Sequence, residues 1–337
     1  MDAAPILAVE NLATAFRTGG FWHRAVRDVS FTVGRNETLA IVGESGCGKS
    51  VTALSIMGLL PPANSRIEAG HIRFAGLDLV GLDEEAMRKL RGNRMSMIFQ
   101  EPMTSLNPVL TVGFQIAETL RYHRGMGRGE AAAAALDLLE QVKIPSARQR
   151  FGDFPHQFSG GMRQRVMIAI ALACRPELLL ADEPTTALDV TIQAQVLSLL
   201  AELKAAYGMS VIFITHNLGV VASIADRVAV MYAGEIVELA PVAELFARPT
   251  HPYTELLLRS IPRVDRDTTG LSAIPGQVPS IAAMPKGCRF APRCPLREPE
   301  CTMRDPELAP LHEVPAHQVR CRVRAPAPAH TTEAAHG

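Results

Sequence analysis

The distribution of apolar residues predicts alternating strands and helices up to about residue 260. Five short runs are apolar at almost every position, as expected of strands covered on both faces in a parallel sheet. These runs are residues 37–42, 95–99, 178–182, 210–215 and 227–234. Residues 129–142 and 190–207 have helical periodicity, and Gly208 directly after the second stretch is a typical helix-ending residue. The alternation predicts an α/β fold with a mainly parallel sheet.

Two regions depart from this alternation. Residues from about 105 to 175 contain consecutive helical stretches with little strand character, which predicts a helical subdomain within a first domain spanning residues 1–260. Beyond it, periodicity almost disappears and prolines become frequent, so we expect residues 261–325 to form a small region that builds little core of its own. Residues 326–337 have the composition of a disordered tail.

Composition and charge narrow the class of protein. A chain of 337 residues, 47% of them hydrophobic, suits one large domain and a smaller second one. The 34 Lys and Arg residues are balanced by 34 Asp and Glu residues, which argues against a nucleic-acid partner held through its phosphates. The longest apolar stretch, residues 166–174, falls short of the ~20 residues that span a bilayer, and no signal-peptide pattern is visible. We expect an intracellular chain that reaches a membrane only through partners.

A glycine-rich segment follows the first of these strands. Residues 43–50, GESGCGKS, match the pattern G-x-x-x-x-G-K-[ST] and precede a predicted helix over residues 51–59. Backbone N–H groups of such a loop surround phosphate oxygens, assisted by the positive end of the helix dipole. The lysine adds a positive charge, and the final hydroxyl can bind Mg²⁺. The predicted nucleotide-binding residues are Gly43, Glu44, Ser45, Gly46, Cys47, Gly48, Lys49, Ser50 and Val51.

Two acidic residues end a second buried strand. Asp182 and Glu183 follow the apolar run that begins at Leu178. Carboxylates at the carboxyl end of a parallel strand are what metal-assisted phosphoryl transfer requires. Asp182 is placed to bind Mg²⁺, and Glu183 to orient or deprotonate the attacking water. The sequence therefore predicts an enzyme that hydrolyses ATP with Mg²⁺ as cofactor.

The segment FSGGMRQR, residues 158–165, offers a second anion site. Ser159, Gly160 and Gly161 present a hydroxyl and unhindered N–H groups at the start of a predicted helix that continues to about residue 174. S-G-G alone is a weak signal, because it often only caps a helix. Its place shortly before the Asp-Glu strand makes the signal strong, although one chain has no second phosphate for it.

Together these motifs resemble the ATP-binding subunits of ABC transporters over residues 6–260. The resemblance implies a P-loop NTPase core of RecA-like fold, with an antiparallel β portion beside the helical subdomain. It also implies a head-to-tail dimer in which each ATP lies between the phosphate loop of one subunit and the S-G-G segment of the other. By position, Gln100 resembles a glutamine that touches Mg²⁺ and senses the transmembrane partner. Asp189 resembles a residue that crosses the dimer interface, and His216 a histidine that contacts the γ-phosphate.

Three details of this resemblance are open in the sequence. Met162 stands where the family usually has a glutamine, so the resemblance leads us to expect the loss of a side-chain contact to the ribose. Phe16 aligns best with the aromatic residue that stacks on adenine, and Phe21 and Trp22 compete for the role. Cys47 lies beside N–H groups directed at phosphate, which suggests either a small filler or a reactive thiol with a lowered pKa.

Four of the six cysteines are clustered near the end of the chain. Cys288, Cys294, Cys301 and Cys321 have the spacing C-x5-C-x6-C-x19-C. In a reducing compartment, clustered thiols indicate a metal more than disulfides. Four thiolates hold either Zn²⁺ or an iron–sulfur cluster. The absence of C-x2-C pairs favours the cluster, with Zn²⁺ and no metal as the alternatives.

Residues 99–108, 248–263 and 287–295 resemble the oligopeptide/dipeptide importer ATPases and extend the similarity to about residue 325. This closer resemblance implies a [4Fe-4S] cluster on the four cysteines and ATP-driven peptide uptake. The implied partners are two transmembrane permease subunits, a second ABC ATPase subunit of related but different sequence and, indirectly, a periplasmic substrate-binding protein. The implied location is the cytoplasmic face of the inner membrane.

Alternatives to peptide import are also compatible with the motifs. Importer ATPases for nickel or glutathione are closely similar, and a homodimer is chemically possible because all hydrolysis motifs are present. A nucleic-acid-associated ABC ATPase is a candidate of a different class, but the zero net charge, the single phosphate loop and the lack of a long coiled coil argue against it. A ribosome-associated factor with two fused cassettes is excluded by the single copy of each motif.

Overall fold

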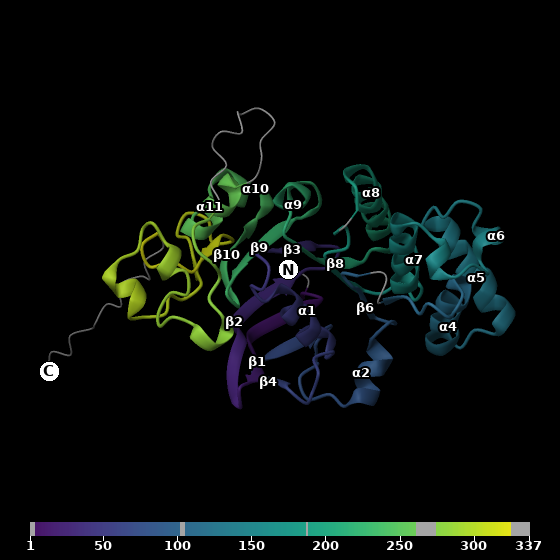
Figure 1. Cartoon of the computed structure of the whole chain (residues 1–337), viewed down its shortest axis with the longest axis horizontal. Coiled ribbons are helices and arrows are strands. Elements are labelled where there is room, and N and C mark those ends of the chain that lie inside the picture. The colour runs from purple at the N-terminus through teal and green to yellow at the C-terminus, as the bar shows by residue number, and fades with distance from the viewer. Residues whose placement is uncertain (1–3, 102–104, 187, 261–273, 325–337) are drawn as a thin grey trace.

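The computed structural model describes residues 4–101, 105–186, 188–260 and 274–324 (Figure 1). Its larger sheet contains β3 (Thr38–Val42), β6 (Met95–Ile98), β7 (Leu178–Asp182), β8 (Ser210–Thr215), β9 (Arg227–Tyr232), β10 (Glu235–Pro241), β11 (Ala309–Pro310) and β12 (Gln318–Val319). The smaller sheet contains β1 (Leu7–Thr18), β2 (Phe21–Val33), β4 (Ser65–Phe74) and β5 (Leu77–Asp78). The predicted disordered tail lies outside the described residues.

Ten α-helices are assigned in these ranges: α1 (Lys49–Met57), α2 (Glu84–Leu90), α4 (Val112–Arg124), α5 (Arg128–Gln141), α6 (Ala147–Arg150), α7 (Gly160–Leu172), α8 (Val190–Tyr207), α9 (Leu218–Ile224), α10 (Val242–Ala247) and α11 (Pro252–Arg259). Short 3₁₀ helices are η1 (Pro155–Gln157), η3 (Ile281–Ala283), η4 (Ala291–Arg293) and η5 (Pro299–Thr302). No helix of the described ranges combines the length and the apolar character that crossing a membrane demands.

The larger sheet has the strand order β11-β12-β10-β9-β3-β8-β7-β6. Strands β9, β3, β8, β7 and β6 are parallel, as the continuous apolar runs predict, and β10 and β12 continue the sheet in antiparallel pairing. Both faces are covered. In β7, Leu178 and Leu180 pack into the core beside the smaller sheet, whereas Leu179 and Ala181 pack into the core beside the helices. Because these five strands are parallel neighbours, their carboxyl ends lie along the same edge of the buried sheet.

The consecutive helices α4 to α7 gather at one end of the molecule, beyond β6 (Figure 1). Helix α7 is fixed between them and the sheet through Val166, Ile168 and Ala169, which are fully buried. Its first turn is capped by Ser159, whose Oγ accepts a hydrogen bond from Met162 N at 3.4 Å. The S-G-G segment thus starts a helix that is anchored by its later turns and leaves its first turn partly exposed.

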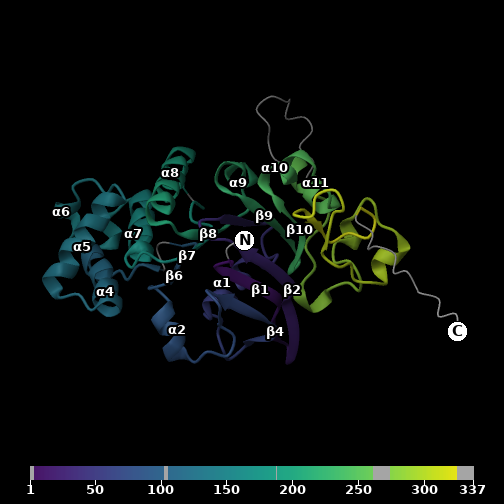
Figure 2. The ribbon, with the colours of Figure 1, turned by 180° about the vertical axis from the view of Figure 1, so that it is seen from behind.

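The C-terminal segment, here residues 274–324, lies at the opposite end of the molecule, as the view from behind also shows (Figure 2). Strand β12 pairs with β10, placing Val319 opposite Glu238. Phe290 is buried against Tyr232 and Tyr253 in a core shared with the sheet. This segment therefore obtains its apolar core from the cassette, in keeping with its proline-rich, aperiodic sequence.

Candidate nucleotide-binding site

The glycine-rich loop joins β3 to α1, and its backbone requires glycine at its ends. Gly43 has a φ angle of 150°, and a Cβ added there would lie 2.2 Å from the carbonyl oxygen of Met231. Gly48, the residue that caps α1, has a φ angle of 105°. These conformations turn the loop around a small space at the carboxyl end of β3, which is the geometry of an anion cradle.

Lys49 closes the loop from within. Its side chain is buried, and Nζ donates hydrogen bonds to the carbonyl oxygens of Gly43 at 2.8 Å and Glu44 at 3.1 Å. The ammonium group is therefore held at the centre of the loop, where it can exchange these carbonyl contacts for phosphate oxygens.

Asp182 ends β7 next to the start of α1. Burial raises the pKa of its carboxyl group, and a hydrogen bond from the Ser50 hydroxyl opposes that rise. Its Oδ1 is buried and has no hydrogen-bond partner among the described residues. A buried carboxylate oxygen without a partner, beside a serine hydroxyl, fits the donor set that a Mg²⁺ ion takes when it also binds phosphates.

The Glu183 carboxylate contacts side chains from the segments that follow β6, β7 and β8. Its Oε2 accepts hydrogen bonds from Thr186 Oγ1 at 2.9 Å and Gln100 Nε2 at 3.4 Å, and it lies 3.2 Å from His216 Nδ1. The backbone of Glu183 is left-handed, with φ of 47°, and its N–H donates to Ile214 O. Such a conformation is uncommon outside glycine and is concentrated at functional sites. It aims the carboxylate into the space beside the loop.

A cavity of about 330 Å³ lies between Lys49, Gln100 and Glu183. It is lined by the phosphate loop and α1 through Ser45, Gly46, Gly48, Lys49, Ser50 and Val51, and by Gln100 and Glu183. Phe16 lines the same cavity, whereas Phe21 is 73% exposed and the ring of Trp22 is covered by the Arg66 guanidinium at 4.1 Å. Of the three aromatic candidates, Phe16 is therefore the one beside the loop.

The S-G-G segment and Asp189 are not among the described residues that line this cavity. Gly161 is packed inward, since a Cβ there would lie 2.6 Å from Ile192 Cγ2. Gly160 faces outward, since a Cβ there would meet only Leu188 Cδ2, at 3.9 Å. Asp189 caps α8 by accepting a hydrogen bond from Ile192 N at 2.9 Å. The cavity of a single chain is thus lined by the loop, Gln100 and Glu183, but not by this second set; Asp182 and His216 are also outside its lining.

The hypothesis of a reactive thiol at Cys47 is wrong. The residue is fully buried, and burial raises the pKa of its thiol. Its Sγ instead fills the space beneath Gly43, 2.7 Å from where a Cβ would stand. Cys47 is therefore a small packing residue whose contribution to the loop is its backbone.

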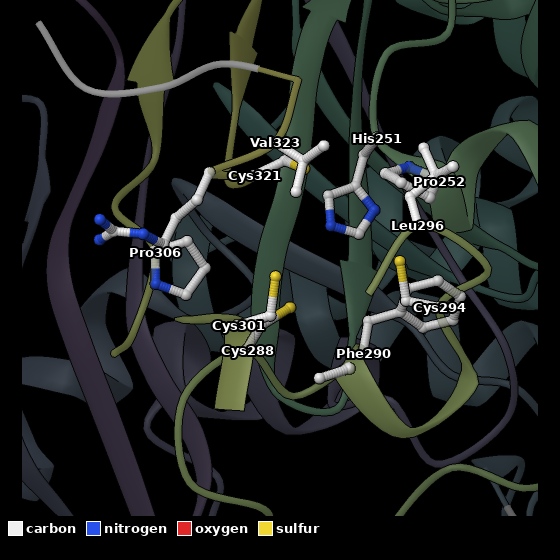
Figure 3. Close-up of a pocket in the computed structure, with 12 residues that line it drawn as sticks. His251, Pro252, Cys288, Phe290, Cys294, Leu296, Cys301, Pro306, Cys321 and Val323 are labelled. Carbon is white, nitrogen blue, oxygen red and sulfur yellow. The ribbon is translucent and has the colours of Figure 1, made fainter. Parts of the chain in front are cut away.

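The four clustered cysteines face one cavity of the C-terminal segment (Figure 3). All are free thiols; Cys321 is buried, and Cys288, Cys294 and Cys301 are half-buried. Within the described ranges, no three His, Cys, Asp or Glu side chains converge as the ligands of one metal ion. Four thiols around one cavity are a donor set that suits either Zn²⁺ or an iron–sulfur cluster when such a group is bound.

Two residues of the C-terminal segment line the nucleotide cavity, although the sequence did not predict them there. Ile281 and Met284 of the C-terminal segment line it together with Phe16 and the loop. Neither residue belongs to a motif or a periodic pattern, so no local signal in the sequence pointed to them.

Comparison with known families agrees with this geometry. Residues 26–186 match the model of the family described as ABC transporter. Residues 237–301 match the model of the oligopeptide/dipeptide transporter C-terminal region. The two matches cover the phosphate loop, the S-G-G segment and the acidic pair in the first case, and three of the clustered cysteines in the second.

Relatives match along nearly the whole chain. A protein of Brucella abortus (strain 2308) is 55% identical over 332 residues, which cover 95% of this chain and 98% of the relative. A protein of Brucella melitensis biotype 1 is 57% identical over 305 residues, covering 87% of this chain and 90% of the relative. Both are provisionally named peptide import ATP-binding proteins.

Solved structures show the same fold. The ATP-binding cassette MJ0796, a dimer in a post-hydrolysis state bound to ADP and Pi, is 28% identical with a TM-score of 0.63, covering 70% of this chain and 98% of that one. CbiO1 from Clostridium perfringens, part of the ABC transporter complex CbiONQ, is 25% identical with a TM-score of 0.61, covering 73% and 92%. The expected P-loop NTPase fold is confirmed. The chain belongs to the ABC transporter ATPases and carries the C-terminal region of their oligopeptide/dipeptide branch.

Proposed function

We propose that this ABC ATPase couples ATP hydrolysis to the uptake of di- and oligopeptides through two membrane-embedded permease subunits. The observation that carries the proposal is the similarity to relatives named for peptide import, which extends over 95% of this chain and includes the C-terminal region. In this proposal, the chain sits on the cytoplasmic face of the inner membrane, and a periplasmic substrate-binding protein delivers the peptide to the permeases. It binds no nucleic acid.

The chemistry assigned to the site uses residues that the structure brings together. Lys49 and the loop N–H groups bind the phosphates, and Ser50, Asp182 and Gln100 hold Mg²⁺, which supplies charge neutralisation when bound. Glu183 accepts the proton of the attacking water, and His216, 3.2 Å from that carboxylate, contacts the γ-phosphate. Phe16 stacks on the adenine, because it is the aromatic candidate that lines the cavity.

The second half of the site is assigned to another subunit. Ser159, Gly160 and Gly161 begin a helix whose N–H groups suit an anion, yet they do not line the cavity of their own chain among the described residues. In this proposal they cover the ATP held by a second ABC ATPase subunit, of related but different sequence, and Asp189 crosses the interface. The dimeric MJ0796 cassette is the precedent for such an assembly.

Co-purification of the chain with its permeases is expected to give an ATPase that peptides stimulate. The complex, in vesicles with the cognate binding protein, should hydrolyse ATP faster when di- or oligopeptides are added, because substrate delivery drives the two cassettes together. ATP turnover and uptake of labelled peptide are measured in the same vesicles.

Nickel and glutathione are the comparison substrates in that assay. Stimulation by either one with no response to peptides would overturn the peptide assignment while leaving the importer role intact. Stimulation by DNA or ribosomes instead would overturn the importer role.

We further propose that Cys288, Cys294, Cys301 and Cys321 hold a [4Fe-4S] cluster, with Zn²⁺ as the alternative. The proposal is supported by four free thiols that line one cavity, and by their spacing without C-x2-C pairs. Protein purified without oxygen is expected to be brown and to contain about four iron atoms and about four sulfide ions per chain. A colourless protein with stoichiometric zinc would contradict the cluster. Cys174→Ser is the matched control: it removes a buried cysteine that follows α7 and lies outside the cluster, and this variant should retain its iron.

A further inference from the structure

The cysteine-rich C-terminal segment contacts the phosphate loop directly. Arg293, between two of the clustered cysteines in sequence, donates from Nη1 to Glu44 Oε2 at 2.7 Å and from Nη2 to Glu44 Oε1 at 3.1 Å. The Arg293 side chain is only 4% exposed, whereas that of Glu44 is 29% exposed. A two-pronged pair of this kind fixes both charge and orientation, which a lysine cannot reproduce.

Arg293 is itself rigidly held. Its Nε donates to Pro275 O at 2.7 Å and its Nη2 to Ile274 O at 3.2 Å. Nη1 also donates to Tyr232 Oη at 3.4 Å, and the guanidinium lies 5.6 Å from the centre of that ring. The backbone of the segment and the end of β9 therefore orient the guanidinium before it meets Glu44.

Glu44 connects this arginine to the lysine of the loop. Its N–H donates to Tyr253 Oη at 3.0 Å, and its carbonyl oxygen accepts from Lys49 Nζ at 3.1 Å. The carboxylate, the N–H and the carbonyl of one residue are thus bound by three different elements. A displacement of Glu44 would therefore also disturb Lys49, because Lys49 donates a hydrogen bond to the carbonyl oxygen of Glu44.

The same segment forms part of the wall of the nucleotide cavity. Ile281 and Met284 line this cavity together with Phe16 and the phosphate loop, and among the described residues they are the ones that the C-terminal segment contributes. Arg289, four residues before Arg293, hydrogen-bonds the carbonyl of Ala233, which also lines the cavity. The C-terminal segment is therefore continuous with the site where the phosphates are proposed to bind.

We propose that Arg293 is a positioning residue for ATP: it neutralises and orients Glu44, so that the phosphate loop presents no unpaired carboxylate to the triphosphate. The inference rests on the proposed nucleotide site. Without Arg293, a carboxylate in the loop would repel the incoming polyanion in a partly buried setting, where charges are poorly screened. The C-terminal segment then sets the affinity of the loop for nucleotide.

The test measures binding of a non-hydrolysable ATP analogue with Mg²⁺ to the full chain by calorimetry. Arg293→Met is expected to raise the dissociation constant about tenfold, since one partner of a hydrogen-bonded charge pair is removed. Glu44→Gln removes the repelling charge and keeps the backbone of the loop, and its dissociation constant is the reference value for the double variant. The double variant is expected to bind like Glu44→Gln, because no unpaired carboxylate remains.

The control is Arg324→Met, which breaks a 3.3 Å ion pair of the same segment with Glu255; neither residue lines the nucleotide cavity. It should leave the dissociation constant unchanged. Arg293→Lys keeps the positive charge but loses the two-pronged contact with Glu44, and we expect it to raise the dissociation constant about threefold. This variant serves as the test if Arg293→Met does not fold.

The outcomes separate this inference from the function on which it rests. No binding by the unmodified chain overturns the proposed nucleotide site. Binding by the unmodified chain together with undiminished binding by folded Arg293→Met overturns the inference alone. A double variant as weak as Arg293→Met, with both folded, also overturns it, because relief of charge repulsion is then not what Arg293 provides.

Discussion

Glu183→Gln is expected to bind MgATP as the unmodified chain does and to hydrolyse it about 10²–10⁴-fold more slowly. The amide keeps the shape of the side chain and can still contact Thr186 and Gln100, but it cannot accept a proton from water. The left-handed backbone at this position, with φ of 47°, is unchanged by the substitution. The hydrolysis rate is measured as the steady-state ATPase activity of the assembled transporter, and MgATP binding is measured by calorimetry.

The matched control lies at the other end of the same strand. Glu177, directly before β7, pairs with Arg94 at 2.5 Å, and Glu177→Gln removes a carboxylate without touching the cavity. That variant should retain its ATPase rate. Hydrolysis by Glu183→Gln within a few-fold of the unmodified rate would refute the role of Glu183 as the base.

Gly160→Ala is expected to lower ATP hydrolysis on the order of 10²-fold, while the single chain still binds nucleotide through its own loop. Inside the chain the added methyl group has room, since its nearest neighbour is Leu188 Cδ2 at 3.9 Å. Any large loss must therefore arise outside this chain, where the partner's phosphates would approach the start of α7. Rates are compared with the substitution in one or in both subunits of the complex.

Gly129→Ala is the control for this variant. Gly129 lies in the first turn of α5, and a Cβ there has nothing within 4 Å. It should leave the ATPase rate intact, because it adds the same methyl group to the first turn of another helix, at an exposed position. Full turnover by Gly160→Ala in both subunits, or full turnover by a strict monomer, would rule out the shared site.

The central strands and the phosphate loop could be predicted because their signals are local. Leu178 to Ala181 are apolar at every position, as expected of a strand covered on both faces, and the loop motif is continuous in sequence. The contact of Gln100 with Glu183 joins residues 83 positions apart. Resemblance, and not pattern, suggested that Gln100 and His216 belong to one site.

Other features had no local signal. Strand β1 pairs with β2 and β4 through several register shifts, so its buried positions follow no strict alternation. The Cys47 hypothesis failed because a sequence lists the neighbours of a thiol along the chain and not the depth at which it is packed. The pair between Arg293 and Glu44 spans 249 positions and can be recognised only once the chain is folded.

The pairing of β12 with β10 has a consequence for where this chain can be divided. A fragment ending before residue 274 would leave β10 as an open edge, and exposed edges recruit strands from other molecules. Glu238, fully buried, would also lose His317, whose Nε2 lies 2.7 Å from its carboxylate. A truncated cassette would thus be prone to self-association through β10, and the Glu238 carboxylate would keep only its hydrogen bonds from the N–H groups of Thr250 and His251.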